Sequence, residues 1–253
     1  MGSLTIDSHI HVYDHRFPAA PTAVVHADDA SVTEYIDTFP ATTGVVVVQP
    51  SAYGLDNRCQ LGAMIDFEAR GVSARGVMVI DAETTVGEIE RLDALGVRGA
   101  RFHMLPGGAV AWQHLEPVAE RIADVGWHIQ LQLDGRELPV RIERLLSLPT
   151  DLVVDHVGRF MPPVAVESTE FDALLQLLDT GRTWVKLSAP YESSADVALV
   201  EPLAAALIEH RPDRLLWASN WPHPGRDRTT ATWVPDGIDE RILVNNATRL
   251  YGF

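Results

Sequence analysis

The chain has 253 residues, of which 46% are hydrophobic and 22% charged, so it is long enough to form one sizeable core. Its formal net charge of −15 repels nucleic acid and anionic membranes, so neither is an expected partner. An anionic small molecule would be repelled as well, unless the pocket that binds it is locally basic.

Short β-branched or apolar runs alternate along the chain with longer stretches of helical pattern. The predicted strands are residues 4–8, 44–49, 75–80, 97–102, 128–133, 152–155, 183–187 and 215–218. The predicted helices are residues 56–70, 86–95, 113–125, 139–148, 168–178 and 195–209. Thr85 followed by Glu88 predicts a capping box at the start of the second helix, and Gly96 is the expected stop at its end.

Eight strands at intervals of roughly thirty residues, separated by helices, are typical of parallel βαβ units. An open, doubly wound sheet is the alternative, but its first strand usually leads into a glycine-rich fingerprint. Here the first strand leads into His9-Ile10-His11 instead. We therefore predict a (β/α)₈ TIM barrel that forms a single domain over residues 1–253.

Polar side chains follow nearly every predicted strand. In a barrel, the loops after all eight strands converge on one face, where the chemistry takes place. Burying so many polar groups without partners would be costly, so the pattern indicates a hydrated or ligand-lined cavity. In chain order, these residues are His9, His11, Gln49, Ser51, Tyr53, Asp81, Arg101, His103, Gln130, Gln132, Asp134, Asp155, His156, Arg159, Lys186, Ser188, Tyr191, Asn220 and His223.

The sharpest motif is the histidine pair after the first strand. His9 and His11 point to the same side, because side chains on a strand alternate between its faces. Two such imidazoles can chelate a divalent ion or bind a substrate, although two histidines packed inside the barrel would give the same pattern. His156 at the end of the sixth strand adds a third nitrogen. Three nitrogens leave one position for water, as catalytic zinc requires.

Cys59 is the only cysteine, so no disulfide can form within the chain, which fits a reducing compartment. The first residues lead directly into a strand-like segment and leave no room for a signal peptide. No apolar run reaches the eighteen or so residues that a membrane span requires. We expect a soluble, cytoplasmic protein.

These motifs together resemble the amidohydrolase superfamily, in the group that contains 2-pyrone-4,6-dicarboxylate lactonases and muconolactone-type hydrolases. The resemblance covers nearly the whole chain, and it is specific through the order and spacing of its motifs. It implies a distorted TIM barrel and hydrolysis of a lactone or a related cyclic ester. The matching segments are residues 7–14, 46–57, 96–103, 126–135, 153–159, 185–191, 215–224 and 245–253.

By this resemblance, His9, His11 and His156 are catalytic residues, and Asn220 occupies the position where the superfamily usually has aspartate. An amide cannot act as a general base near pH 7, and it is a weaker metal ligand than a carboxylate. Three explanations stay open. Another base, such as Asp155 or a histidine, serves the site; the asparagine is an inactivating substitution; or the protein binds its ligand without turning it over.

The resemblance also bears on the cofactor. The lactonase branch includes hydrolysis without a tightly held ion, and no strand offers a plausible carboxylated lysine, since Lys186 comes too late in the chain. We expect at most one divalent metal, held by His9, His11 and His156. Zinc is the first candidate and manganese the second, and metal-free operation is the alternative.

Arg101 and Arg159 match arginines that the resemblance places on substrate carboxylates, a task that suits the fixed donors of a guanidinium group. Surface salt bridges are the alternative for both. Ser51 and Tyr53 are candidates to donate to the same carboxylate or to the lactone oxygen. Further substrate-binding candidates are Tyr191 and His223, and candidates to line the same end of the pocket are His103, Trp112 and His114.

Two further arginines expected of a pyrone-dicarboxylate lactonase are absent, because Gly107 and Glu192 stand in their places. The lost positive charge disfavours a doubly charged ligand, so we expect a small molecule with one carboxylate or a neutral lactone. The leading hypothesis is a lactone hydrolase. Its rivals are a non-oxidative decarboxylase on the same scaffold and a binding protein descended from an enzyme. The oligomeric state, monomer or dimer, stays open.

Overall fold

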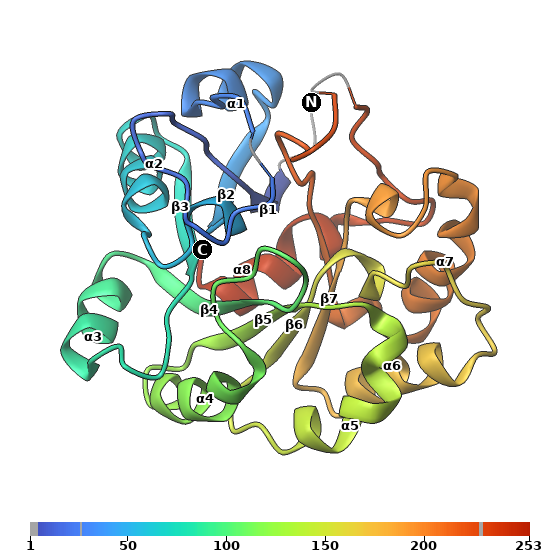
Figure 1. Ribbon diagram of the computed structural model, residues 1–253. Helices are drawn as coiled ribbons and strands as arrows, with labels where there is room; N and C mark the ends of the chain where they lie inside the picture. Colours follow the sequence, from blue (N-terminus) through green and yellow to red (C-terminus); the bar gives the residue numbers. More distant parts are fainter. Residues whose placement is uncertain (1–4, 26, 228–229) are drawn as a thin grey trace.

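The computed structural model describes residues 5–25, 27–227 and 230–253, and its eight parallel strands follow one another around a single sheet in chain order (Figure 1). This arrangement confirms the predicted barrel. The strands are β1 (Thr5–Ile10), β2 (Thr42–Val48), β3 (Ser73–Met78), β4 (Val97–His103), β5 (His128–Gln132), β6 (Leu152–Val154), β7 (Thr183–Leu187) and β8 (Leu215–Trp217).

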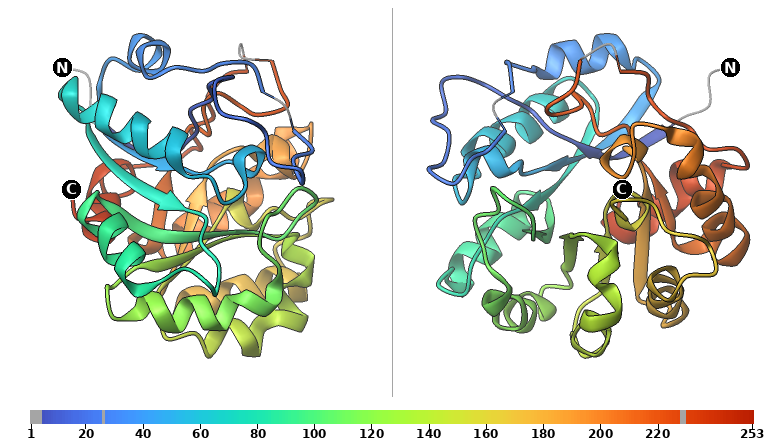
Figure 2. Two further views of the ribbon diagram at one scale, coloured as in Figure 1. Left: turned by 60° about the vertical axis from the view of Figure 1, so that its left-hand side comes forward. Right: turned by 45° about the vertical axis from the view of Figure 1, so that its right-hand side comes forward.

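The helices lie outside the strands (Figure 2). Five of the six predicted helices are present within two residues of their predicted bounds. The helix predicted over 195–209 begins only at residue 201, and the patterns of α1 and of the C-terminal helix were missed. Ser31 and Glu34 form a capping box at the start of α1, and that spacing is readable in the sequence. The helices are α1 (Val32–Thr38), α2 (Arg58–Ala69), α3 (Val86–Ala94), α4 (Leu115–Ala123), α5 (Leu138–Leu146), α6 (Thr169–Asp179), α7 (Glu201–His210) and α8 (Asn246–Tyr251).

The capping box predicted for α3 is only half formed. Thr85 accepts a hydrogen bond from the Glu88 backbone at 3.2 Å, but the Glu88 carboxylate pairs with Arg91 at 2.7 Å instead of returning to Thr85. An arginine three residues further along the helix competes for the same carboxylate. Gly96 has the left-handed φ of 93° expected of a residue that ends a helix.

The barrel closes between β8 and β1 through the segment that follows β8. Asn220 donates its backbone N–H to the carbonyl of His9 at 3.0 Å, and His11 donates to the carbonyl of Trp221 at 2.8 Å. The buried carboxylate of Asp7 accepts the backbone N–H of Ser219 at 3.0 Å. These bonds fix the histidine pair against the loop that carries Asn220.

The end of the barrel interior opposite the strands' carboxyl ends is closed and mainly apolar, with the buried ring of His128 as a polar exception. Inward-facing residues such as Val46, Val77 and Val153 form one cluster with Ala247 and Tyr251 of α8. Most buried polar side chains lie toward the opposite end, where the strands finish and a ligand can enter. Among the described residues, no helix combines the length and apolar character needed to span a membrane.

Candidate active site

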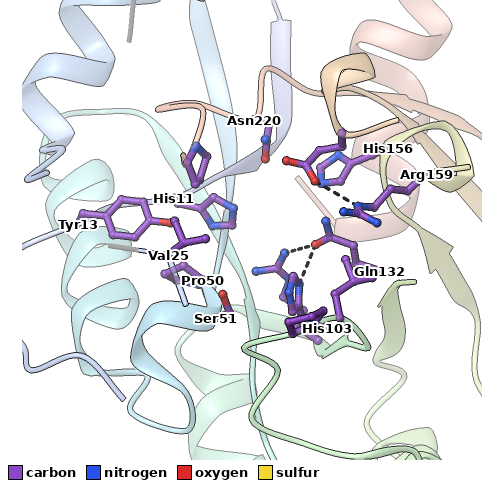
Figure 3. A pocket seen from close by; sticks show the side chains of 15 residues that line it. His11, Tyr13, Val25, Pro50, Ser51, His103, Gln132, His156, Arg159 and Asn220 are labelled. Atoms are coloured by element: carbon purple, nitrogen blue, oxygen red, sulfur yellow. Dashed lines mark hydrogen bonds and ion pairs between the residues drawn. The ribbon is translucent and has the colours of Figure 1, made fainter. Parts of the chain in front are cut away.

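A cavity of about 180 Å³ opens at the carboxyl ends of the strands (Figure 3). It brings together side chains that are far apart in the sequence and that come from the ends of β1, β2, β4, β5, β6, β7 and β8. Its lining residues are His11, Tyr13, Val25, Pro50, Ser51, Arg101, His103, Leu105, Pro106, Gln132, His156, Arg159, Glu192, Asn220 and Pro224.

Left-handed backbone conformations gather around this cavity. Of the described residues other than glycine, all six with positive φ follow β6, β7 or β8: His156, Val157, Arg159, Ala189, Asn220 and His223. Such conformations cost about 1–3 kcal/mol each, and they are typical of sites where surrounding structure holds functional groups in place. The turn at residues 156–159 aims His156 and Arg159 into the cavity.

His9 and His11 lie side by side at the cavity floor, with their Nε2 atoms 3.2 Å apart. The Nδ1 atom of His11 is 2.7 Å from the carbonyl oxygen of Val48, which can only accept, so Nδ1 carries the proton. The lone pair of His11 Nε2 therefore points at His9. Burial lowers the pKa of His11 to about 3 and lowers that of His9 well below its usual value, so both rings are neutral near pH 7.

His156 lies beside this pair, with its ring centroid 5.0 Å from that of His9. Its Nδ1 atom is 2.9 Å from the Ser188 hydroxyl, and burial lowers its pKa well below the usual value. The Asp155 carboxylate is buried behind the rings, and its Oδ1 lies 3.4 Å from Nδ1 of His9. His11 and His156 line the cavity, whereas His9 and Asp155 support it from beneath.

Lys186 of β7 reaches the centre of the barrel beneath His9, a role that the sequence did not suggest. Its ammonium donates to the carbonyl of Ser8 and to Oε1 of Gln130, both at 2.7 Å, and lies 3.8 Å from Asp155. Burial lowers the pKa of Lys186 to about 7. A lysine inside an otherwise apolar strand is the signal that could have pointed to it.

The floor of the site fits a divalent metal. One ligand atom from each of His9, Asp155 and His156 can be chosen so that all three lie within 4.8 Å of one another. Asp155 Oδ1 is buried and has no hydrogen-bond partner among the described residues. The His9–His11 spacing of 3.2 Å suits neighbouring ligands of one tetrahedral ion. Imidazole and carboxylate donors suit zinc or manganese.

Arg101 is held in the wall of the cavity by two bonds. One amino group donates to the carbonyl of Gln49 at 2.6 Å and the other to Oε1 of Gln132 at 2.7 Å. The same Gln132 oxygen lies 3.0 Å from Nδ1 of His103. These bonds fix a buried cation in the cavity wall, which supplies the local positive charge that an anionic ligand needs.

Arg159 also lines the cavity but is already paired. Its Nε donates to Oε2 of Glu192 at 3.1 Å, and the two side chains are 12% and 24% exposed. Figure 3 shows Arg159 beside His156. Glu192 thus offsets one of the two cations that the sequence suggested for substrate carboxylates.

Asn220 is held by Tyr191 and His223. The Asn220 amide Nδ2 donates to the Tyr191 hydroxyl at 2.8 Å, and that hydroxyl lies 2.9 Å from Nδ1 of His223. Asn220 Oδ1 is buried, has no hydrogen-bond partner among the described residues, and belongs to a side chain that lines the cavity. Tyr191 and His223, predicted to touch substrate, lie behind Asn220 instead of in the lining.

The remaining candidates divide between the cavity and its surroundings. Ser51 and His103 line the cavity, but Tyr53 does not, because its hydroxyl exchanges hydrogen bonds with the backbone of Asp14. Trp112 and His114 lie outside the lining. The Trp112 ring packs under the guanidinium of Arg141 at 4.5 Å, and His114 Nδ1 accepts a long bond from the Ala82 backbone.

Comparisons with known proteins cover nearly the same span as the barrel. A family model described as amidohydrolase matches residues 6–253. The D-galactarolactone isomerase of Agrobacterium fabrum is 35% identical over 82% of this chain and 75% of its own length. The 2-pyrone-4,6-dicarboxylate hydrolase of Comamonas testosteroni is 31% identical over 97% of this chain and 89% of its own length. An apo crystal structure from Agrobacterium tumefaciens matches with a TM-score of 0.90 and 31% identity, over 98% of this chain and 96% of that one.

Proposed function

This chain belongs to the amidohydrolase family, and we propose that it is a hydrolase that opens a small lactone carrying at most one carboxylate. The observation that carries the proposal is that His11, His156 and Arg101 face one small cavity at the carboxyl ends of the strands. Relatives named for action on lactones, a pyrone dicarboxylate hydrolase among them, support the same reaction class.

Each residue has a distinct task in this proposal. Arg101 binds the substrate carboxylate, and Ser51 donates to the ring oxygen or the carbonyl. The Asn220 oxygen accepts a hydrogen bond from the attacking water and orients it, because Tyr191 holds the amide. The neutral imidazole of His156 accepts its proton, His11 lies beside it in the lining, and the Asp155 carboxylate beneath stabilises the positive charge that develops.

The charges around the cavity favour a singly charged ligand. Arg101 is the lining cation that has neutral partners, Gln49 and Gln132, whereas Arg159 is paired with Glu192. A second substrate carboxylate near Arg159 would also meet the Glu192 carboxylate, and like charges at short range repel.

We further propose that the floor of the site holds at most one divalent metal, zinc before manganese, on His9, Asp155 and His156 with His11 at its side. When bound, such an ion would polarise the lactone carbonyl or lower the pKa of water. Metal-free hydrolysis is the alternative. Elemental analysis of the purified protein, combined with activity before and after chelation, distinguishes the two cases.

A lactone isomerase is the second candidate. Asn220 supplies no general base at the strand-eight position, and one relative bears the name of an isomerase. In this reaction a hydroxyl of the substrate, rather than water, would attack the carbonyl and form a different ring. The same cavity would serve both reactions, so the identity of the nucleophile is the point to test.

The deciding experiment measures product mass on a panel of small lactones for the wild type and Asn220→Asp. Hydrolysis adds one water, isomerisation leaves the mass unchanged, and decarboxylation removes carbon dioxide. We expect the wild type to add water. The hydrolase proposal would be contradicted if the wild type turned over no lactone while Asn220→Asp opened lactones. That result would favour an inactivated or ligand-trapping protein.

Three further expectations complete the proposal. The single cysteine, Cys59, which is buried, supports a reducing, cytoplasmic location. The continuous run of eight strands supports a single domain over residues 1–253. The proposed partner is a small molecule, and nucleic acid and membranes are disfavoured by the net charge of −15.

A further inference from the structure

The Arg159–Glu192 ion pair in the cavity wall is held in place by the backbone of two loops. Arg159 follows β6 in a left-handed conformation, with φ at 47°, and Glu192 ends the short 3₁₀ turn Pro190–Glu192 after β7. The turn is closed by the backbone bond from Glu192 to Ala189 at 2.9 Å. Two different loops therefore converge to place one guanidinium beside one carboxylate.

The pair leaves hydrogen-bonding capacity unused on both sides. Arg159 uses Nε, and Glu192 uses Oε2. Among the described residues, neither Oε1 of Glu192 nor the two amino groups of Arg159 have a hydrogen-bond partner, and both residues line the cavity. A free acceptor thus stands next to free donors at the surface that a ligand would touch.

This combination matches a hydroxyl group better than a charged group. A hydroxyl both donates and accepts, so it can bind Glu192 and Arg159 at once. A carboxylate only accepts and would be repelled by Glu192, and an ammonium only donates and would be repelled by Arg159. An apolar group would take the free amino groups of Arg159 and the free oxygen of Glu192 out of water without giving them hydrogen-bond partners.

We propose that Arg159 and Glu192 form a hydroxyl-binding subsite, so that the substrate is a hydroxylated lactone with one hydroxyl group at this pair and its carboxylate directed to Arg101. This inference rests on the proposed lactone chemistry and adds the substrate class. Glu192 is then a specificity-determining residue, since it selects for hydroxyl groups and against a second carboxylate.

The test uses two ligands and three variants. Calorimetry measures the Kd of a six-carbon polyhydroxylated monocarboxylate and of hexanoate, its deoxy counterpart. The variants are Glu192→Gln, which keeps the shape and removes the charge; Glu192→Arg, which adds a second cation; and Glu116→Gln. The last is the matched control, because it breaks an Arg144–carboxylate pair that lies outside the cavity lining.

We expect Glu192→Gln to weaken the polyhydroxylated ligand relative to hexanoate by roughly fivefold to tenfold, because a neutral amide oxygen replaces the charged acceptor. Glu116→Gln should leave the ratio unchanged. Glu192→Arg should bind a six-carbon dicarboxylate at least about tenfold more tightly than the wild type does. An unchanged ratio in Glu192→Gln overturns the subsite.

Turnover separates this inference from the proposed function. The kcat/KM values for a hydroxylated lactone and its deoxy counterpart are measured with the same variants. If the wild type opens neither lactone but its binding ratio depends on Glu192, the hydrolase proposal fails and the subsite stands. If the wild type opens both lactones equally well and the binding ratio does not depend on Glu192, the subsite fails and the hydrolase proposal stands.

Discussion

The amide of Asn220 donates to the Tyr191 hydroxyl at 2.8 Å, and this bond determines which way the amide faces. Because that hydroxyl accepts from Asn220, its own proton is free for Nδ1 of His223, 2.9 Å away. An aspartate at position 220 could not donate and would compete with His223 for the same proton. The network is therefore matched to asparagine, which argues against reading Asn220 as a chance inactivating substitution.

Tyr191→Phe should lower kcat about tenfold and change KM little, because the amide loses the bond that holds its oxygen toward the cavity. Steady-state kinetics on a lactone substrate measure kcat and KM separately and so test this expectation. Tyr53→Phe is the matched control, since its hydroxyl bonds the Asp14 backbone and the residue does not line the cavity. Equal effects of the two substitutions on kcat would contradict a positioning role for Tyr191.

Arg101→Lys should raise KM by about tenfold to a hundredfold, because an ammonium cannot reproduce the fixed guanidinium fork in the cavity wall. The substitution also removes a donor from the buried carbonyl of Gln49 or from Gln132, so the free energy of unfolding should fall by about 1–3 kcal/mol. Kinetics and urea unfolding measure the two effects. A normal KM with a neutral lactone would show that the loss concerns the substrate carboxylate.

The fold could be predicted from the sequence because each strand is a short apolar run and each strand end is polar. The C-terminal helix was missed because it is stabilised by packing against the barrel and not by its own sequence pattern. Tyr251, for example, is fully buried against residues of several strands. Such long-range packing leaves no local pattern. The α1 capping box at Ser31 and Glu34 was readable, but a helix of seven residues shows little periodicity.

The site was predictable where residues lie near the carboxyl ends of strands, as with His9, His156 and Arg101. Orientation was not predictable, because it depends on tertiary contacts. Tyr53 follows β2, yet a hydrogen bond to the backbone of Asp14, far away in the sequence, directs its hydroxyl away from the cavity. Lys186 was dismissed on its position in the chain alone, although inward alternation along β7 places it beneath His9.

Gly135→Ala should distort the turn that carries His156. A Cβ atom at position 135 would lie 2.3 Å from the carbonyl oxygen of Gly158, and Gly135 also donates its N–H to Arg159 at 3.2 Å. The backbone of one of the two turns would have to move to make room for this atom. We therefore expect the free energy of unfolding to fall by about 1–3 kcal/mol, and activity to fall with it. Urea unfolding and kinetics check both effects.

Gly62→Ala is the control for that experiment. Gly62 lies within α2, and a Cβ atom there would meet nothing within 4 Å. Alanine favours the helix over glycine, so this variant should gain up to about 1 kcal/mol in stability with unchanged activity. A Gly135→Ala protein as stable and active as Gly62→Ala would contradict the close approach of the two turns.

Acid should destabilise the barrel through His128, which lies at the lower end of β5 away from the cavity. Its ring is buried against Gly99, where a Cβ would come within 2.5 Å of Nε2. Burial lowers the pKa of His128 to about 3, so the folded protein keeps the ring neutral while the unfolded chain protonates it near pH 6.5. Its contribution to stability is complete above pH 6.5 and is lost as the pH falls toward 3.

Between pH 7.5 and 5, this single group should reduce the free energy of unfolding by about 2 kcal/mol, from 1.36 kcal/mol for each pH unit below 6.5. Urea unfolding of the wild type and His128→Gln at both pH values isolates the effect, because the glutamine cannot titrate. The stability gap between the two proteins should narrow by that amount at pH 5 and stay constant between pH 7.5 and 9. A constant gap down to pH 5 would mean that the ring accepts a proton in the folded barrel, and that solvent reaches the end that α8 closes.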